Sequence, residues 1–186
     1  MQMQRPQEAS LIMNNFETVR NGIVKGLHEF TGAAVVPSDT TDRRPDRPYI
    51  TYKIISAANN AGTFSLVDAD ITSESPRFEH DIMTTRREQP TFNLSVNTYS
   101  DCEITAYGLA CAARDWFTFH GDLLFVALNI VVVSAGNISD RAQQIVDDYE
   151  NRYGFDVKIR AARGINRRVG TIEQHDLGRR ASNGTT

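Results

Sequence analysis

The sequence predicts an α+β fold in which an antiparallel (mixed) β-sheet carries two α-helices packed on one face. Three observations lead to this expectation. Two segments repeat apolar residues at helical spacing, several others alternate apolar and polar residues, and the order along the chain is helix, strands, helix, strands. The 186 residues, 40% of them hydrophobic, suit one core. We therefore expect a single α+β domain over residues 1–177 and a polar tail over residues 178–186.

The first helix is expected over residues 7–30. Its apolar residues recur at steps of three or four and form one stripe: Ile12, Phe16, Val19, Ile23, Leu27 and Phe30. Gly32 follows as a C-terminal stop. Residues 37–48 then predict a charged loop, because Pro45 and Pro48 both forbid a continuing helix.

Alternation predicts the next strands. Residues 49–55 form one of them, and residues 78–85 and 91–99 form a hairpin. In the second arm of this hairpin apolar positions alternate with polar ones, which predicts one buried side and one wet side. Residues 56–76 are rich in Ala, Asn, Gly, Ser and Asp and predict a long loop, within which a short strand pair around residues 64–67 stays open.

A second helix is expected over residues 101–119, with Ser100 and Glu103 in the pattern of a capping box. Its apolar stripe combines small residues, which let a helix lie close to a sheet, with aromatic ones: Ala106, Leu109, Ala110, Ala113, Trp116 and Phe117. Gly121 ends this helix. The β-branched run within residues 124–134 predicts a buried strand.

The last third of the chain predicts further strands. Residues 140–153 fit either a helix or a bent strand by their spacing alone. Residues 155–160 alternate and predict a strand, with residues 169–177 as its partner across a turn at residues 164–166.

The formal net charge is −3, but it is unevenly distributed. Residues 151–186 hold eight basic and three acidic residues and so carry +5, which leaves −8 for residues 1–150. A chain with an acidic part and a basic part can attract copies of itself or charged partners. The longest apolar run, residues 123–133, is too short to span a membrane, and the N-terminus has no secretory pattern. We therefore expect a soluble protein without a membrane partner.

The sequence contains no catalytic motif of known mechanism, and we expect no enzyme activity, cofactor or metal. The four histidines fall on four different predicted elements: His28, His80, His120 and His175. Neighbours on a strand face opposite ways, so His80 is not expected to share a face with Glu79 or Asp81. Cys102 and Cys111 would lie on opposite faces of one helix and are predicted to be two small buried thiols.

Arginines are the candidate interaction residues. The proline-containing loop interleaves three of them with Asp42 and Asp46, so its local charge nearly cancels. Neither predicted helix is basic and the pI is near 5.8, which argues against sequence-specific nucleic-acid binding. Contact with another protein is the more ordinary use of such arginines. The candidate interface residues are Arg43, Arg44, Arg47, Arg86, Arg87, Arg167 and Arg168.

Two segments carry a resemblance to a known family. Residues 47–53 (Arg-Pro-Tyr-Ile-Thr-Tyr-Lys) and 147–157 (Asp-Asp-Tyr-Glu-Asn-Arg-Tyr-Gly-Phe-Asp-Val) are similar to those of the neck or tail terminator family of tailed phages and prophages. The resemblance extends from about residue 11 to residue 177 and includes the order of the elements. It favours a strand over residues 145–153. The loop over residues 56–76 and the arginine-rich end depart from the pattern and leave open which neighbours this chain contacts.

The resemblance implies a non-enzymatic virion protein, located in the tail or neck and assembled in the host cytoplasm. Such proteins form a ring, commonly a hexamer, at the head-proximal end of the tail. The ring ends polymerisation of the tail tube and joins the tail to head-completion (connector) proteins. Its expected partners are other copies of the chain, the tail tube, the sheath if the tail is contractile, and DNA that passes through the lumen without sequence-specific binding. Opposite charges on one chain suit a ring, because each copy joins the next through two different patches.

Two alternatives remain from the sequence. The first is another neck component, such as a head-closure or tail-completion protein, which differs only in its position in the particle. The second is a small phage-encoded hydrolase that uses His80 with acids from elsewhere in the chain. The hydrolase predicts a pocket where His80, a carboxylate and a third polar group converge.

Overall fold

The computed structural model describes residues 7–41, 43–59, 63–76, 78–145 and 148–170, and within them all side chains except those of residues 7–16, 57–59, 143–145 and 148–149. The chain divides into two compact units. The main unit comprises Met1–Phe64 and Glu88–Arg163, and the second unit comprises Ser65–Arg87 and Gly164–Thr186. The single domain expected over residues 1–177 stays a prediction, and residues 178–186 lie outside the described residues.

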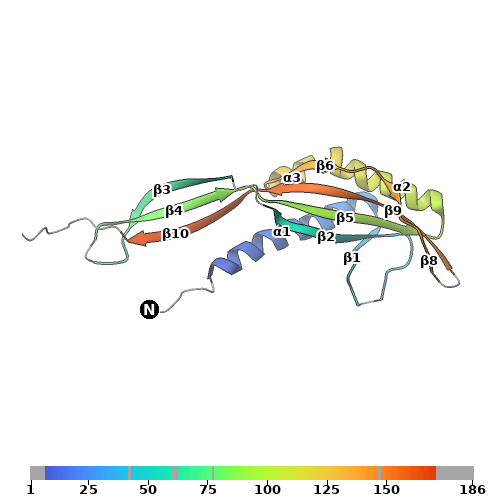
Figure 1. The fold of residues 1–186 in the computed structure, drawn as a ribbon, viewed down its shortest axis with the longest axis horizontal. Coiled ribbons are helices and arrows are strands. Elements are labelled where there is room, and N and C mark those ends of the chain that lie inside the picture. Colours follow the sequence, from blue (N-terminus) through green and yellow to red (C-terminus); the bar gives the residue numbers. More distant parts are fainter. Residues whose placement is uncertain (1–6, 42, 60–62, 77, 146–147, 171–186) are drawn as a thin grey trace, which may run out of the picture. The chain divides into compact units, whose positions relative to one another are not determined.

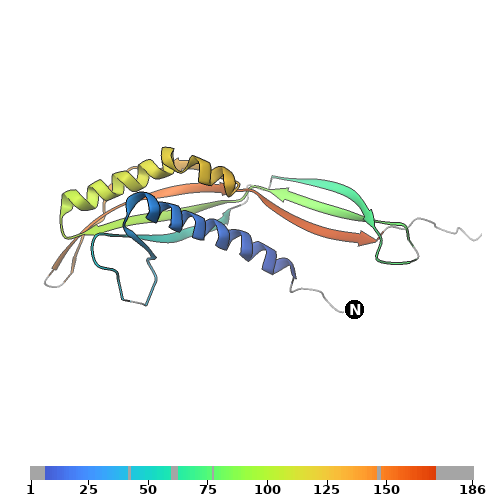
Figure 2. The ribbon, with the colours of Figure 1, turned by 180° about the vertical axis from the view of Figure 1, so that it is seen from behind.

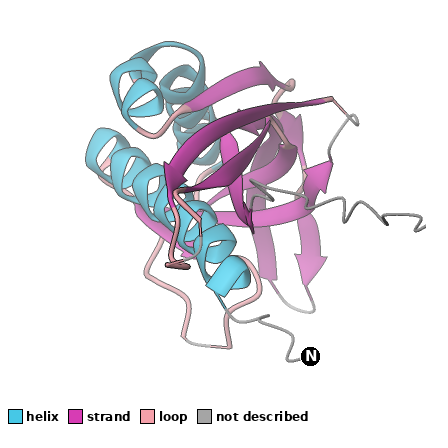
Figure 3. Cartoon of the chain, turned by 90° about the vertical axis from the view of Figure 1, so that its left-hand side faces the viewer, coloured by secondary structure: helices cyan, strands magenta, loops and turns pink. Residues whose placement is uncertain are grey.

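The main unit is built from helices and strands that follow the predicted order. In chain order its elements are α1 (Gln7–Thr31), β1 (Ala34–Pro37), β2 (Tyr49–Asn59), β5 (Thr91–Ser100), α2 (Glu103–Asp115), the π-helical turn η1 (Trp116–His120), α3 (Asp122–Ala127), β6 (Ile130–Ala135), β7 (Ser139–Asp140), β8 (Gln143–Ile145) and β9 (Asp148–Ala161). Figure 3 shows its helices gathered on one side of its strands. The predicted α+β class is therefore confirmed.

The sheet of the main unit has the strand order β1-β2-β5-β9-β6, and β7 and β8 also pair with β9. The short strand β1 runs parallel to β2, whereas β2, β5, β9 and β6 are antiparallel to their neighbours. β5 lies at the centre, with Tyr99 opposite Tyr49 on one side and Asn97 opposite Gly154 on the other. The sheet is therefore mixed only at its β1 edge.

The core lies between this sheet and the helices. From behind, α1 and α2 both lie against the strands (Figure 2). The predicted stripes of both helices are buried at Val19, Ile23 and Leu27 and at Ala106, Ala110 and Ala113, as are the alternate residues of β5 and β9: Phe92, Leu94, Val96, Phe155, Val157 and Ile159. The Thr98 hydroxyl donates to the Ala106 carbonyl at 2.8 Å and ties α2 to β5. Small residues therefore allow the close contact that the sequence predicted.

The second helical segment differs from its prediction at both ends. The N-cap of α2 is Cys102, whose side chain makes no capping bond, so the predicted capping box is wrong. Glu103 instead accepts a hydrogen bond from the Tyr153 hydroxyl at 2.9 Å. The predicted helix over residues 101–119 continues past Gly121 through η1 into α3.

The chain after Gly121 is helical, so the strand predicted over residues 124–134 is wrong in its first half. Only residues from Ile130 onward form β6, and Val131 and Val133 are about half exposed, which also corrects the expected burial. Apolar residues in a short run fit a helix and a strand equally well. Asn129, with φ of 52°, marks the change from one to the other.

The second unit is a three-stranded sheet of order β10-β4-β3, formed by β3 (Phe64–Thr72), β4 (His80–Glu88) and β10 (Arg163–Gly170). β4 lies in the middle and runs opposite to both neighbours (Figure 1). The loop predicted over residues 56–76 is therefore wrong, because β2 continues to Asn59 and β3 fills most of the rest. Almost every residue of β3 is exposed, so this strand has no buried side whose apolar alternation could have predicted it.

The hairpin predicted from residues 78–85 and 91–99 is also wrong. Both strands exist, but β4 pairs with β3 and β10, whereas β5 pairs with β2 and β9. The turn predicted at residues 164–166 lies inside β10, and the described part of its predicted partner, residues 169–170, ends that same strand. Residues 171–177 lie outside the described residues. Local alternation identified the strands but not their partners, because pairing is decided by contacts distant in sequence.

The ambiguous segment over residues 140–153 forms strands where it is described. β8 pairs with β9 from Gln143↔Glu150 to Ile145↔Asp148. The strand that the family resemblance favoured over residues 145–153 is thus confirmed, apart from residues 146–147, which are not described.

Candidate functional site

The loop before β2 holds three of the candidate arginines and is fastened to the main unit. Arg47 donates through Nη1 to Asp101 at 2.7 Å and through Nη2 to Glu150 at 3.1 Å. Arg44 reaches the same Glu150 oxygen at 3.4 Å. The hydrogen bond to Asp101, followed by the one to Glu150, raises the pKa of Arg47 despite partial burial. These contacts join the loop to β9 and to the residue after β5.

Arg44 of this loop and Arg152 of β9 lie over one of two stacked tyrosines. Tyr49 and Tyr99, opposite each other on β2 and β5, have ring centroids 4.9 Å apart and planes within 9°. Arg44 and Arg152 lie over the Tyr99 ring at 5.8 and 5.5 Å from its centroid. Burial raises the pKa of Tyr49. These arginines therefore cover the tyrosines at this end of the sheet.

The remaining polar face of β5 is covered by Arg141, which the sequence did not single out. Its Nη1 donates to the Ser95 hydroxyl at 2.8 Å and to Asn97 Oδ1 at 2.9 Å, and its Nη2 pairs with Asp156 at 3.1 Å. Asn97 is only 2% exposed. The wet side predicted for this strand is thus wrong: polar side chains face it, but an arginine and a loop cover them.

In the second unit, Arg168 links neighbouring strands through its side chain. It pairs through Nε with Asp81 at 2.7 Å and also bonds Glu74 and the Thr72 carbonyl. The hydrogen bond from Arg168, followed by the one from Ser73, lowers the pKa of Asp81. Arg168 therefore connects β10 to β4 and to the end of β3.

The seven candidate arginines thus fall into two groups. Arg47 and Arg168 are about three-quarters covered and hold their own unit together. The other five arginines are exposed: Arg43, Arg44, Arg86, Arg87 and Arg167. The structure brings Arg44 and Arg47 together on Glu150. Their role as interface residues stays a prediction.

Exposed apolar side chains are a second feature that the sequence reasoning missed. On the main unit they include Ile104 and Tyr107 of α2, Phe119 of η1, and Leu123 and Val126 of α3. The spacing of residues 119, 123 and 126 could have identified an outward helical stripe. It was missed because residues 124–134 were interpreted as a buried strand.

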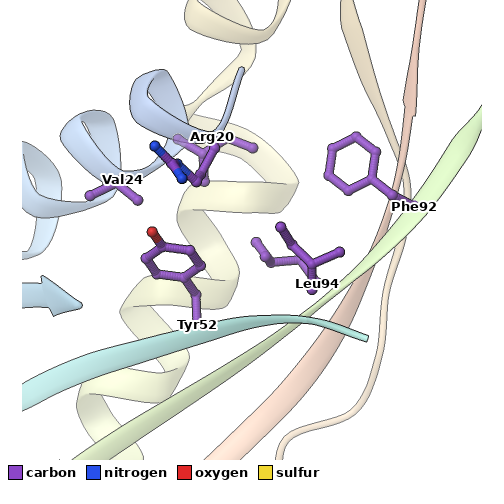
Figure 4. A pocket seen from close by; sticks show the side chains of 7 residues that line it. Arg20, Val24, Tyr52, Phe92 and Leu94 are labelled. Carbon is purple, nitrogen blue, oxygen red and sulfur yellow. The ribbon is translucent and has the colours of Figure 1, made fainter. Parts of the chain in front are cut away.

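The residues invoked for a hydrolase do not form a pocket of the predicted kind among the described residues. His80 is an exposed residue of β4 and lies 3.6 Å from Glu79, which corrects the expectation that the two point apart. Asp81 pairs with Arg168 instead. A pocket elsewhere, between α1 and strands β2 and β5, holds only about 10 Å³ (Figure 4). That space accommodates about one water molecule. A wider, open hollow of about 450 Å³ lies between α1 and β1, and its lining includes His28 and not His80.

The cysteines and histidines are placed as follows. Cys102 is exposed, so the expectation of two buried thiols is wrong for it, while Cys111 is half-buried and both are free thiols. His28 hydrogen-bonds the Ala33 carbonyl through Nδ1 at 2.8 Å, and His120 stacks on Phe30. In the described part of the chain, no three His, Cys, Asp or Glu side chains are grouped as metal ligands would be.

Comparison with known families identifies the chain. The sequence profile of phage neck terminator proteins matches residues 21–179. The chain belongs to the phage neck terminator family. The family resemblance predicted from residues 47–53 and 147–157 is thus confirmed, and it gives this neck terminator a structural role in the neck or tail of a phage particle. No curated protein matches the sequence. No helix among the described residues is long and apolar enough to cross a membrane.

Proposed function

We propose that this neck terminator forms a closed ring at the head-proximal end of the phage tail, ends polymerisation of the tail tube and joins the tail to the head-completion proteins. The observation that carries the proposal is the family match over residues 21–179. We propose six copies in the ring. Assembly takes place in the host cytoplasm, and the product is part of the virion.

The surface of the chain supports assembly through its exterior. A ring requires two different patches on each copy, since each patch meets the other type on the next copy. The main unit exposes apolar residues on α2, η1 and α3, and the second unit exposes both apolar and basic residues on its strands. Large exposed apolar groups of this kind are typical of contact surfaces.

The role we propose is structural and not catalytic. The neighbours of the ring are the tail tube, a sheath if the tail is contractile, and the head-completion proteins. Exposed Arg43, Arg86, Arg87 and Arg167 are proposed as contact residues, whereas Arg47 and Arg168 act by holding their own units in shape. DNA passes through the lumen without sequence-specific binding, and the net charge of −3 favours weak attachment to phosphates.

A phage in which the gene for this chain is inactivated tests the function. We expect tail tubes of uncontrolled length that do not join heads, and restoration of normal tails by the chain supplied in trans. Tails of normal length beside heads that fail to bind them would contradict termination and assign the chain to head closure. Native mass spectrometry of the isolated chain at low salt tests the ring itself, for which only monomers at high concentration would be the contrary result.

A further inference from the structure

The most exposed large apolar side chains of η1 and α3, the last two helical elements described, form one stripe. Leu123 is 88% exposed, Val126 75% and Phe119 71%. Their spacing of four and three residues places them on one side of the segment, while Phe117 and Phe125 face the core. We call Phe119, Leu123 and Val126 the helical stripe. Three such side chains in a row are typical of a surface that another molecule covers.

Carboxylates border this stripe. Asp115 and Asp122 are both exposed. Asp115 lies four residues before Phe119, and Asp122 lies directly before Leu123. The helical spacing of residues 115, 119, 122 and 126 keeps both acids on the same side as the stripe. The neighbouring cation Arg114 donates through Nε to the Gly136 carbonyl at 3.0 Å. The stripe is therefore an apolar surface with a negative border.

One face of the second unit has the complementary character. The hydroxyl of Thr85 donates to Asn166 at 3.0 Å, and Arg168 pairs with Asp81, so these four side chains share one face of β4 and β10. Alternation along each strand places the residues between them on the other face. We call this the basic face. It carries Ile82, Arg86, Ile165, Arg167 and Val169, together with His80, Thr84 and the ion pair of Glu88 with Arg163 at 3.1 Å.

The second unit needs a surface to pack on. Every residue of β3 except Ile71 is exposed, and Val169 of β10 is exposed as well. Three strands form a stable sheet in water when an apolar face is buried or a helix covers it. The stretch from the end of α2 through η1 to α3, with its apolar stripe and two carboxylates, matches a sheet face that carries apolar residues and two exposed arginines.

We propose that the basic face of one copy packs on the helical stripe of the next copy, with Arg86 and Arg167 beside Asp115 and Asp122. The occupant is a second copy because one chain carries both matching surfaces, and such a contact between unlike patches generates a ring. The inference rests on the proposed ring and specifies which two surfaces form it.

Sedimentation velocity on the full chain tests the contact with paired variants. Leu123→Lys puts a cation into the stripe, and Arg167→Asp reverses the charge at one of the two arginine positions of the basic face. Each weakens association about tenfold or more, because like charges then oppose each other across the contact. The matched controls are Ile55→Lys, at a residue 51% exposed on β2, and Arg160→Asp, at an exposed residue of β9; both assemble as the unchanged chain does.

A mixture of the two variants tests that the surfaces belong to different copies. The Leu123→Lys chain keeps an intact basic face, and the Arg167→Asp chain keeps an intact stripe. Mixed in equal amounts they form one-to-one dimers through these two intact surfaces. Combining Asp122→Arg with Arg167→Asp in one chain restores assembly, because the charges are exchanged across the contact.

Four results would overturn the inference. If rings form from both variants as from the unchanged chain, the ring stands and the contact we assign is wrong. If neither variant assembles and the mixture yields no dimer, the two surfaces do not meet between copies. If Leu123→Lys rings form normally but no longer bind head-completion proteins, the stripe belongs to that partner. An unchanged chain that stays monomeric contradicts the ring and the contact together.

Discussion

Arg47 and Glu150 lie 103 residues apart in the sequence, and the Nη2 atom of Arg47 donates to the Glu150 carboxylate at 3.1 Å. Each residue belongs to one of the two segments that carry the family resemblance, residues 47–53 and 147–157. The resemblance therefore marks a contact that shapes the main unit, where the loop before β2 meets β9.

Loss of the Glu150 carboxylate will destabilise the main unit. In Glu150→Ala, Arg47 and Arg44 lose a shared acceptor that is almost fully buried, and we expect a loss of about 1–3 kcal/mol in the free energy of unfolding. Denaturant unfolding measures it. The matched control is Asp39→Asn, which removes the exposed ion pair with Lys53 at 3.0 Å and changes stability by less than about 1 kcal/mol. Equal effects of the two variants would contradict the role of Glu150.

Two glycine substitutions will have opposite signs. A Cβ on Gly154 would lie 2.4 Å from Asn97 Oδ1 and 2.7 Å from the Val96 carbonyl, so Gly154→Ala forces the strands apart and costs about 1–3 kcal/mol. Gly108 lies exposed in α2 with nothing near its added Cβ. Gly108→Ala therefore stabilises the chain by about 0.5–1 kcal/mol. Thermal unfolding compares the two directly, and a stable Gly154→Ala variant would refute the close approach.

Arg141 will prove necessary for the covered face of β5. In Arg141→Ala the buried side chains of Ser95 and Asn97 lose their donor, with an expected cost of about 1–3 kcal/mol in unfolding. Arg141→Lys recovers only part of it, because one ammonium cannot reach both groups and Asp156 in the geometry of a guanidinium. The control Arg160→Ala, at an exposed residue of β9, stays within about 0.5 kcal/mol of the unchanged chain.

The carboxyl group of Asp81 will titrate below its ordinary pKa of 3.8, because Arg168 and Ser73 favour its charged form. The stability that this contact gives the second unit is present above the ordinary pKa and is lost as the pH falls through the lowered one. Carbon-detected NMR of the carboxyl group measures the pKa. In Arg168→Gln the pKa moves up toward 3.8, and an unchanged pKa in this variant would show that Arg168 is not the cause.

The packing of the helices could be predicted from the sequence, because it depends on local spacing. Val19, Ile23 and Leu27 needed only the helical period to be assigned to the core, and the alternation of Phe155, Val157 and Ile159 needed only the period of a strand. Both patterns repeat over enough residues to exceed chance. The sequence therefore predicted the layers of the main unit.

Strand partners and the covered polar face could not be predicted in this way. β4 and β5 are separated only by Gln89 and Pro90, yet they pair in different sheets, because partner choice depends on distant contacts. The Asn97 side chain was expected to face solvent, but Arg141, which is 44 residues away in the sequence, covers it. Among the candidate arginines, the charge pattern identified Arg47 and Arg168, but only the structure shows that they bind within their own units.

The most direct test of the central claim is a cryo-electron microscopy reconstruction of the phage neck in which this chain is traced. We predict a closed ring of identical copies between the tail tube and the head-completion proteins, with unlike surfaces of neighbouring copies in contact. A reconstruction in which the chain lies outside the neck, or is present there as separate copies that do not touch one another, would contradict it.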